Sequence, residues 1–538
     1  MPQRTEGAEV YPLRHAADDY LHCFWEFIHP VFPILHRPSF MRRFEALWSE
    51  SQGPNAGSKQ DEFDHIVFVS SLNLVFALGC QFSDLVREPN RAHVAEEFYQ
   101  RARKLFIYDI LDSASITLVQ MLLLTSVYLQ STSHANRCWN VVGLAVRAAQ
   151  SIGMDSEPPS RTPRDPLTRE LRRRLWHTCV TMDRLVAMTF GRATITSGTE
   201  SVPKPLVIDD EYLTEQHEGV QPSEEVPRLG LFVWSLKLYD ILHEILATLY
   251  NKRSERPGPR GRDGENWNLL SDILTLNQRL DEFQAQLPEY LRPQTQSMSP
   301  PNLRKADHKN LQRHVLHCRF LYTRVILLRP LLLLGNDLDS LSTPSATTPH
   351  LKNIMFTSAC SLCVQTGHLL LEKLRENLEG PYRVSAWHSV YLAVGAAIVL
   401  LSAQKCASFR TESEQAALGR SWQRCLAVLG HYKQRINAAH HAIRVLESLR
   451  HEMMSRYSKG NDTGRKGVME PRIVGNEQLQ DNGGNASSTE RNAWGDFPEY
   501  YAMDTPWNGF DFPEEGTAWL SQHLVDLDWM DLPWVPPT

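Results

Sequence analysis

The sequence predicts an all-α protein with many antiparallel helices in two packed helical lobes and a disordered C-terminal acidic and aromatic tail. Two observations support this prediction. Apolar residues recur at helical spacing in nearly every long segment, while the alternation that is typical of strands is scarce. The chain of 538 residues, 42% hydrophobic and 22% charged, has the composition of a globular protein and can bury a large core.

The helical pattern of the first lobe is clearest in two segments. In residues 137–153 the apolar groups fall on one helical face, and Gly153 stands where a C-terminal cap is expected. Residues 171–190 form a second amphipathic helix, which carries three arginines at positions 172–174. Cations at the N-terminal end of a helix do not favour its dipole. We therefore expect acidic neighbours to compensate these arginines.

The two lobes are separated by residues 251–266, which are basic and rich in Pro and Gly. This segment breaks the helical pattern and predicts a linker or loop near 251–268. Its basic side chains could also form a nuclear import signal or contact phosphates, although a solvated linker is favoured. Helical periodicity resumes at about residue 269. We assign residues 1–15 to an N-terminal tail and residues 16–457 to one helical domain.

Two segments of different composition follow this domain. Residues 458–493 are polar and rich in Gly, Asn and Ser, which predicts a disordered linker. In residues 494–538 acidic side chains alternate with bulky apolar ones, a composition typical of disordered activation segments. A partner with an apolar groove and a basic rim could bind residues 520–532 as a short induced helix. The alternative is that the tail docks its aromatic side chains on its own domain.

The side chains that we expect to make this activation contact are Trp519, Leu524, Leu527, Trp529 and Leu532.

Charge and hydropathy exclude two kinds of partner. A net charge of −6 excludes a basic surface for nucleic acid along the whole chain. The longest apolar runs, residues 118–129 and 390–402, are shorter than the roughly 20 residues that cross a bilayer. We expect both runs to be buried helices and expect no membrane partner.

Metal and enzyme signatures are also missing from the sequence. The nine cysteines are scattered through apolar segments, which predicts reduced and buried thiols. Cys360 and Cys363 form the only CxxC pair, and no second pair stands at zinc-finger spacing. No G-x-S-x-G, G-x-G-x-x-G or H-E-x-x-H motif is found. We therefore expect no metal, no cofactor, no catalytic residue and no enzyme activity.

Residues 20–40 read YLHCFWEFIHPVFPILHRPSF, an aromatic-rich helix that runs into a series of His-Pro, Phe-Pro and His-Arg-Pro steps. This stretch resembles the opening of the regulatory middle homology domain of fungal zinc-cluster transcription factors, also called the fungal-specific transcription factor domain. Further segments resemble the helices of that family in the expected order; they are residues 72–83, 92–106, 115–130, 139–153, 318–332 and 387–403.

Residues 172–195, RRRLWHTCVTMDRLVAMTFGRATI, carry the strongest resemblance. The family pattern is a run of arginines, Leu-Trp-Trp, a helix that ends in Asp-Arg, and Gly-Arg-Pro. This chain departs from the pattern at His177 and at Ala193. Residues 202–208, followed by Asp209 and Asp210, resemble the acidic stretch that comes next. The motif residues in the two regions are His29, Pro30, Pro33, Arg37, Phe40, Arg173, Arg174, Trp176, Asp183, Arg184, Gly191 and Arg192.

The charged residues of this motif have two interpretations. In the first, Asp183 and Arg184 form partly buried ion pairs that hold helices together. In the second, they line a pocket for a small ligand or a partner. We favour the first. His29 and His36 stand among prolines and aromatics, and we expect them to be packed and hydrogen-bonded.

The resemblance implies a regulator of transcription in a fungal nucleus that controls one metabolic pathway, such as a secondary-metabolite gene cluster. The helical domain would hold or release the activation segment, whose partner would be the transcription machinery or a coactivator. The family's six-cysteine zinc cluster is not found, so we expect DNA to be reached through a missing N-terminal module or a partner, in a homodimer or heterodimer. The alternative function is an α-helical small-molecule-binding protein or an enzyme of metabolism.

Overall fold

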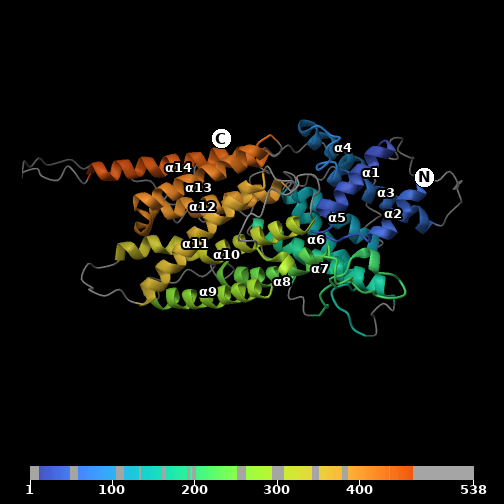
Figure 1. Cartoon of the computed structure of the whole chain (residues 1–538), viewed down its shortest axis with the longest axis horizontal. Helices are drawn as coiled ribbons and strands as arrows, with labels where there is room; N and C mark the ends of the chain where they lie inside the picture. Colours follow the sequence, from blue (N-terminus) through green and yellow to red (C-terminus); the bar gives the residue numbers. More distant parts are fainter. Residues whose placement is uncertain are drawn as a thin grey trace, which may run out of the picture. The chain divides into compact units, whose positions relative to one another are not determined.

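All regular structure in the described part of the chain is helical (Figure 1). The computed structural model describes residues 11–48, 59–104, 114–131, 135–159, 165–190, 194–196, 201–250, 262–293, 308–341, 351–378, 386–434 and 437–463. The prediction of an all-α fold is therefore confirmed for these residues. The predicted activation segment, with Trp519, Leu524, Leu527, Trp529 and Leu532, lies outside them.

The chain divides into two units within its last helix, α14 (Asn437–Thr463). The larger unit extends to Leu446, and the smaller one begins at Glu447. In the smaller unit the described residues, up to Thr463, are helical. The helix thus continues past residue 457, where we predicted the start of a linker.

The N-terminal part of the larger unit is built around two apolar helices, α3 (Lys59–Gly79) and α5 (Ile116–Gln130), which pack against each other. Helices that are apolar on all sides are stable only when they are surrounded by other elements. Neighbours of α3 are α1 (Arg14–Cys23) and α4 (Arg91–Lys104), while α6 (Ala135–Ser151) and α7 (Pro166–Phe190) contact α5.

A π-helical turn and a proline-containing segment connect the first two helices. A π-helical turn, η1 (Phe24–Ile28), extends α1, and α2 (Arg37–Ala46) follows after a segment that contains two prolines.

Local signals explain how several of these helices begin and end. The Ser115 hydroxyl accepts a hydrogen bond from the backbone N–H of Leu118 at the start of α5. Asp165 accepts from the backbone N–H groups of Leu167 and Thr168 at the start of α7. After α6, Gly153 adopts a positive φ of 67°, which confirms the predicted cap.

The C-terminal part of the larger unit packs around α10 (His308–Leu341). This long helix contacts α8 (Gly230–Ile245), α9 (Arg262–Ala285), α11 (Leu351–Glu376) and α12 (Ala386–Lys405). A further helix of this part, α13 (Glu412–Tyr432), packs on α11 and α12.

The two parts meet where α7 contacts α8, and α9 begins at Arg262, inside the loop that we predicted near 251–268. Helices on both sides of that loop belong to the same unit.

The apolar runs 118–129 and 390–402 lie within α5 and α12, and their side chains are almost all buried, as predicted. Among the described helices, one stretch, Asn353–Glu376 of α11, is long and apolar enough to cross a membrane. Half of that stretch is buried, and α11 packs against three other helices. The core helix of a globular protein meets the same criterion, so α11 carries no argument for a membrane.

The cysteines are buried, as the sequence predicts. Burial raises the pKa of the Cys318 and Cys363 thiols to about 12, which makes both poor nucleophiles. Within the described ranges no three His, Cys, Asp or Glu side chains are grouped so that they could hold a metal ion.

Gly79, the last residue of α3, allows α1 to approach closely. A Cβ atom at this position would lie 2.0 Å from the backbone oxygen of Tyr20. We predict that Gly79→Ala lowers the free energy of unfolding by about 1–3 kcal/mol, because the backbone of α1 must move. The matched control is Gly419→Ala in α13, where nothing lies within 4 Å and a gain of up to about 1 kcal/mol is expected.

The measurement for this pair is thermal unfolding of the purified chain. A midpoint for Gly79→Ala at or above that of the wild type would contradict the packing that we describe.

Candidate functional site: the buried Arg174–Asp210 network

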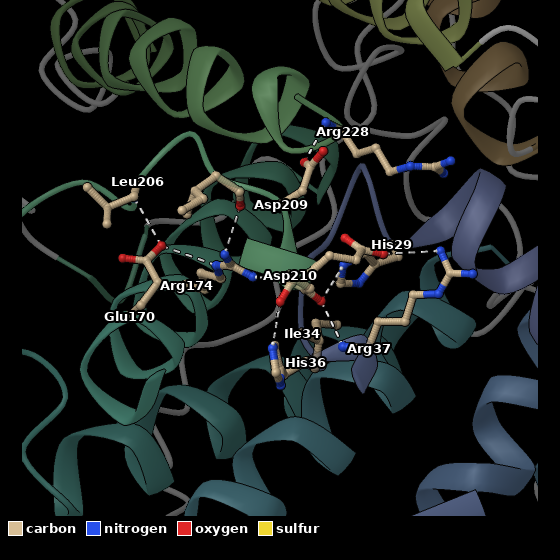
Figure 2. A network of polar contacts seen from close by, with 12 residues as sticks. His29, Ile34, His36, Arg37, Glu170, Arg174, Leu206, Asp209, Asp210 and Arg228 are labelled. Carbon is tan, nitrogen blue, oxygen red and sulfur yellow. Dashed lines mark hydrogen bonds and ion pairs between the residues drawn. The ribbon is translucent and has the colours of Figure 1, made fainter. Parts of the chain in front are cut away.

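A network of buried polar groups joins three segments that are far apart in the sequence (Figure 2). The first segment connects η1 to α2, the second is the N-terminal half of α7, and the third is the extended chain that ends in the 3₁₀ turn η4 (Asp210–Tyr212). We call it the Arg174–Asp210 network; its members are His29, His36, Arg37, Glu170, Arg174 and Asp210.

The guanidinium of Arg174 lies at the centre of this network and is only 1% exposed. All three of its nitrogens donate hydrogen bonds. Nε donates to Glu170 Oε1 at 3.2 Å, Nη1 to Asp210 Oδ1 at 2.5 Å, and Nη2 to the Ile208 carbonyl at 3.1 Å. Glu170 stands one helical turn before Arg174, so α7 places this ion pair by its own periodicity.

Asp210 connects α7 to the N-terminal segment. Its Oδ2 atom accepts from the backbone N–H of Arg37 at 2.7 Å and lies 3.3 Å from His29 Nε2. Its backbone carbonyl lies 3.0 Å from His36 Nε2. Arg37 is the first residue of α2, and the preceding His36 gives this helix no side-chain cap. The carboxylate of Asp210 therefore caps α2 from a distant part of the chain, where a negative charge also suits the helix dipole.

The pKa shifts of the two carboxyl groups in the network show how burial and neighbouring charges balance. Burial would raise the pKa of Asp210, but the charge of Arg174, followed by that of His29, outweighs burial and lowers it. Burial raises the pKa of Glu170, and Arg174 opposes that rise. The buried guanidinium thus keeps Asp210 ionised in an apolar environment.

Asp209 organises the loop that follows the network. Its Oδ1 accepts from the backbone N–H of Arg228 at 2.7 Å, and its Oδ2 accepts from Gln221 Nε2 at 3.3 Å. The Arg228 side chain then donates to Glu26 Oε1 at 2.7 Å, in η1. Asp209 thus joins the two ends of the segment from residue 209 to 228, and Arg228 attaches that segment to η1.

Asp183 and Arg184 are adjacent in α7 but contact different segments of the chain. Arg184 Nη1 pairs with Asp240 Oδ1 of α8 at 2.7 Å, and Lys204 Nζ binds the other oxygen of that carboxylate at 2.7 Å. Asp183 instead accepts from the backbone N–H groups of Ile195 and Thr196 and from the Thr196 hydroxyl. The ion pair that we expected is therefore present for Arg184, whereas Asp183 caps the segment after α7.

The other two arginines of the motif also find acceptors. Arg173 makes two hydrogen bonds to Glu157, at 2.7 and 2.6 Å. Arg172 Nη2 donates to the carbonyls of Ile152 and Gly153, at the C-terminal end of α6. The acidic compensation predicted for residues 172–174 is confirmed for Arg173 and Arg174, while Arg172 uses the negative end of a helix.

The remaining motif residues pack in the core. Pro30, Pro33, Phe40 and Trp176 are buried, and Phe40 contacts the rings of Trp25 and Phe68. Gly191 and Arg192 lie outside the described residues. His177 is buried and its Nε2 lies 3.0 Å from the Pro203 carbonyl.

Our sequence reasoning missed several partners that the structure brings to these residues, namely Glu26, Glu157, Glu170, Arg228 and Asp240. The spacing of Glu170 and Arg174 could have been recognised as a helical ion pair. No local signal points to the other pairs.

The Ser39 hydroxyl lies 2.8 Å from His36 Nδ1, at the start of α2, and the charges of the network are used to join segments. The geometry therefore favours the structural interpretation over a ligand pocket.

Comparison with known proteins places this arrangement in a family. Residues 21–284, which include every member of the Arg174–Asp210 network, match the fungal specific transcription factor domain. Residues 21–284 thus form a domain of this family. The resemblance predicted from residues 20–40 and 172–195 is thereby confirmed.

Similar proteins include "Sorbicillinoid biosynthetic cluster transcription factor 2" of Penicillium rubens, 26% identical over 78% of this chain and 58% of the relative. A second is "Sorbicillinoid biosynthetic cluster transcription factor sor3" of Hypocrea jecorina, 25% identical over 77% of this chain and 56% of the relative. "Transcription factor asqA" of Emericella nidulans is 30% identical over 36% of this chain and 34% of its own. The chain thus spans little more than half the length of the first two.

We predict that Arg174→Met lowers the free energy of unfolding by about 3–5 kcal/mol, because Asp210 and Glu170 lose the cation that compensates their burial. Adding Asp210→Asn to this variant should recover part of the loss. The control is Arg279→Gln, whose ion pair with Glu244 is exposed and should contribute less than about 1 kcal/mol. Denaturant unfolding compares the variants, and equal losses for Arg174→Met and Arg279→Gln would refute the central role of Arg174.

His177 gives a prediction for the dependence of stability on pH. Burial lowers the pKa of His177 from 6.5 to about 4, with the Pro203 carbonyl opposing this shift. Since the unfolded chain then binds more protons below about pH 6.5, stability falls as the pH drops from 6.5 towards 4. His177→Gln keeps an N–H donor but does not titrate, so the stability lost between about pH 7 and pH 5 should shrink by about 2 kcal/mol.

Urea unfolding over this pH range measures the effect. The control is His93→Gln, which makes the same substitution at a side chain that is 78% exposed. Superimposable profiles for the wild type and His177→Gln would show that His177 does not resist protonation.

Proposed function

We propose that this protein regulates transcription in a fungal nucleus and controls one metabolic pathway, such as a secondary-metabolite gene cluster. The observation that carries the proposal is the domain match over residues 21–284. Two relatives that align with more than three quarters of this chain are, by name, transcription factors of the sorbicillinoid biosynthetic cluster. The proposal includes no enzymatic role and no membrane partner.

In this proposal the helical domain is a rigid support. The Arg174–Asp210 network joins the N-terminal segment, α7 and the 202–212 stretch, and the Arg184–Asp240 pair joins α7 to α8. The acidic and aromatic residues 494–538 would contact the transcription machinery or a coactivator. A net charge of −6 does not favour direct DNA binding, so DNA would be reached through a zinc-cluster module, attached to this chain or carried by a partner in a homodimer or heterodimer.

The test is a transcript profile of cells that lack the gene and of cells that overexpress it. We predict a compact set of genes, neighbours on one chromosome, whose transcripts fall in the first strain and rise in the second. Overexpressing a chain that ends at residue 493, or one with Leu527→Ala and Trp529→Ala, should leave those transcripts unchanged. The matched control replaces two polar residues of the same segment, Asn508→Ala and Gln522→Ala, and should act like the wild type.

Unchanged transcripts together with an altered metabolite pool would overturn the proposal in favour of an α-helical enzyme or small-molecule-binding protein. Full activity of the chain that ends at residue 493 would show that the tail is not the activation segment.

A further inference from the structure

Arg319, in the middle of α10, places a positive charge inside the larger unit, and no described carboxylate pairs with it. Its side chain is 7% exposed. Nη1 donates to Ser235 Oγ at 2.9 Å, and the guanidinium carbon lies 5.5 Å from the centre of the Tyr239 ring. Both partners belong to α8 and both are neutral. No acidic side chain among the described residues forms an ion pair with Arg319.

The buried arginines of the charged motif lie in a different environment from that of Arg319. Arg174 has two carboxylate partners, and Arg184 has one. Burying a charge without a partner costs several kcal/mol, and a hydroxyl and an aromatic ring offset only part of that cost. Among the described residues, no carboxylate offsets the cost of burying Arg319.

The unused donors of Arg319 lie on one edge of its guanidinium. Nε is shielded from solvent and has no hydrogen-bond partner, and Nη2 donates to no described residue. The N–H bonds of Nε and Nη2 are nearly parallel. Two parallel donors at this spacing match the two oxygens of a carboxylate, which binds such an edge through two hydrogen bonds.

A second buried polar atom without a described partner belongs to His388 of α12, a helix that also packs on α10. His388 Nε2 is buried and makes no hydrogen bond in the described structure. Burial, followed by the charges of Arg319 and His314, lowers the pKa of His388 well below its usual range. The imidazole is therefore neutral at neutral pH, and it lies within the electrostatic reach of Arg319.

We propose that the site around Arg319, on the helix α10 that packs against both α8 and α12, binds a small carboxylate anion. The carboxylate oxygens accept from Nε and Nη2 of Arg319, while Ser235 and His388 supply the neutral polar groups beside it. A bound water could satisfy Nε but would bring no charge. A single guanidinium matches a monoanion better than doubly charged phosphate.

The probe is acetate, the smallest carboxylate that can use both oxygens while presenting a methyl group. Thermal unfolding of the purified full chain is followed in sodium acetate, sodium chloride and sodium phosphate at equal ionic strength. We expect acetate to raise the midpoint by about 2–4 °C in a saturable way, beyond chloride and phosphate. Arg319→Gln should remove this shift. The control Arg324→Gln, on the same helix but paired with exposed Asp281, should retain it.

A second measurement covers the case in which Arg319→Gln does not fold. In the wild type labelled with ¹⁵N-arginine, acetate should move one Nε–H signal that exchanges slowly with solvent. Equal midpoint shifts with all three salts, an unchanged shift in Arg319→Gln, or no Nε–H signal that responds to acetate would each overturn the site. Because both measurements use purified protein, their failure leaves the proposed role in transcription untouched.

Discussion

The carboxylate of Asp210 is the group on which the N-terminal half of this fold depends. One oxygen pairs with Arg174 and the other caps α2 through the backbone of Arg37. The segment before α2 contains Pro30 and Pro33, which have no N–H groups to donate. That segment cannot be held by a regular ladder of backbone hydrogen bonds, so its position is fixed by side chains and by contacts to Asp210.

Four of the motif residues take part in this same set of contacts. His29 and Arg37 meet Asp210, Arg174 binds it from α7, and Arg184 extends the connection to α8 through Asp240. A buried ion pair of this kind adds less to stability than its Coulomb energy suggests, because both charges lose water. Its value here is that it allows one arrangement of the three segments, since any other arrangement would leave a charge unpaired in the core.

The sequence predicted the helices well where their periodicity was strong, and it predicted that residues 172–174 need acceptors. Asp210 stood in the acidic stretch that the resemblance pointed to, yet its partners could not be inferred. Long-range pairs such as Arg184 with Asp240 depend on how α7 and α8 cross, which no local pattern encodes. Arg319 was overlooked for the same reason, because a buried arginine in a helix is distinguished from an exposed one only by what surrounds it. The start of α9 at Arg262 was missed because glycines and charges nearby favour a loop.

The distant cap of α2 has a consequence for how the chain acquires its structure. The backbone N–H of Arg37 is separated from its Asp210 acceptor by 173 positions, and Arg228 from Glu26 by 202. During synthesis, α2 leaves the ribosome long before the residue that completes its first turn. Contacts between residues so far apart in the sequence slow folding. Until they form, apolar surface stays exposed, and chaperones bind such surface. Fragments that end before Asp210 will lack this cap, and a dissection of the domain should keep residues 11–228 together.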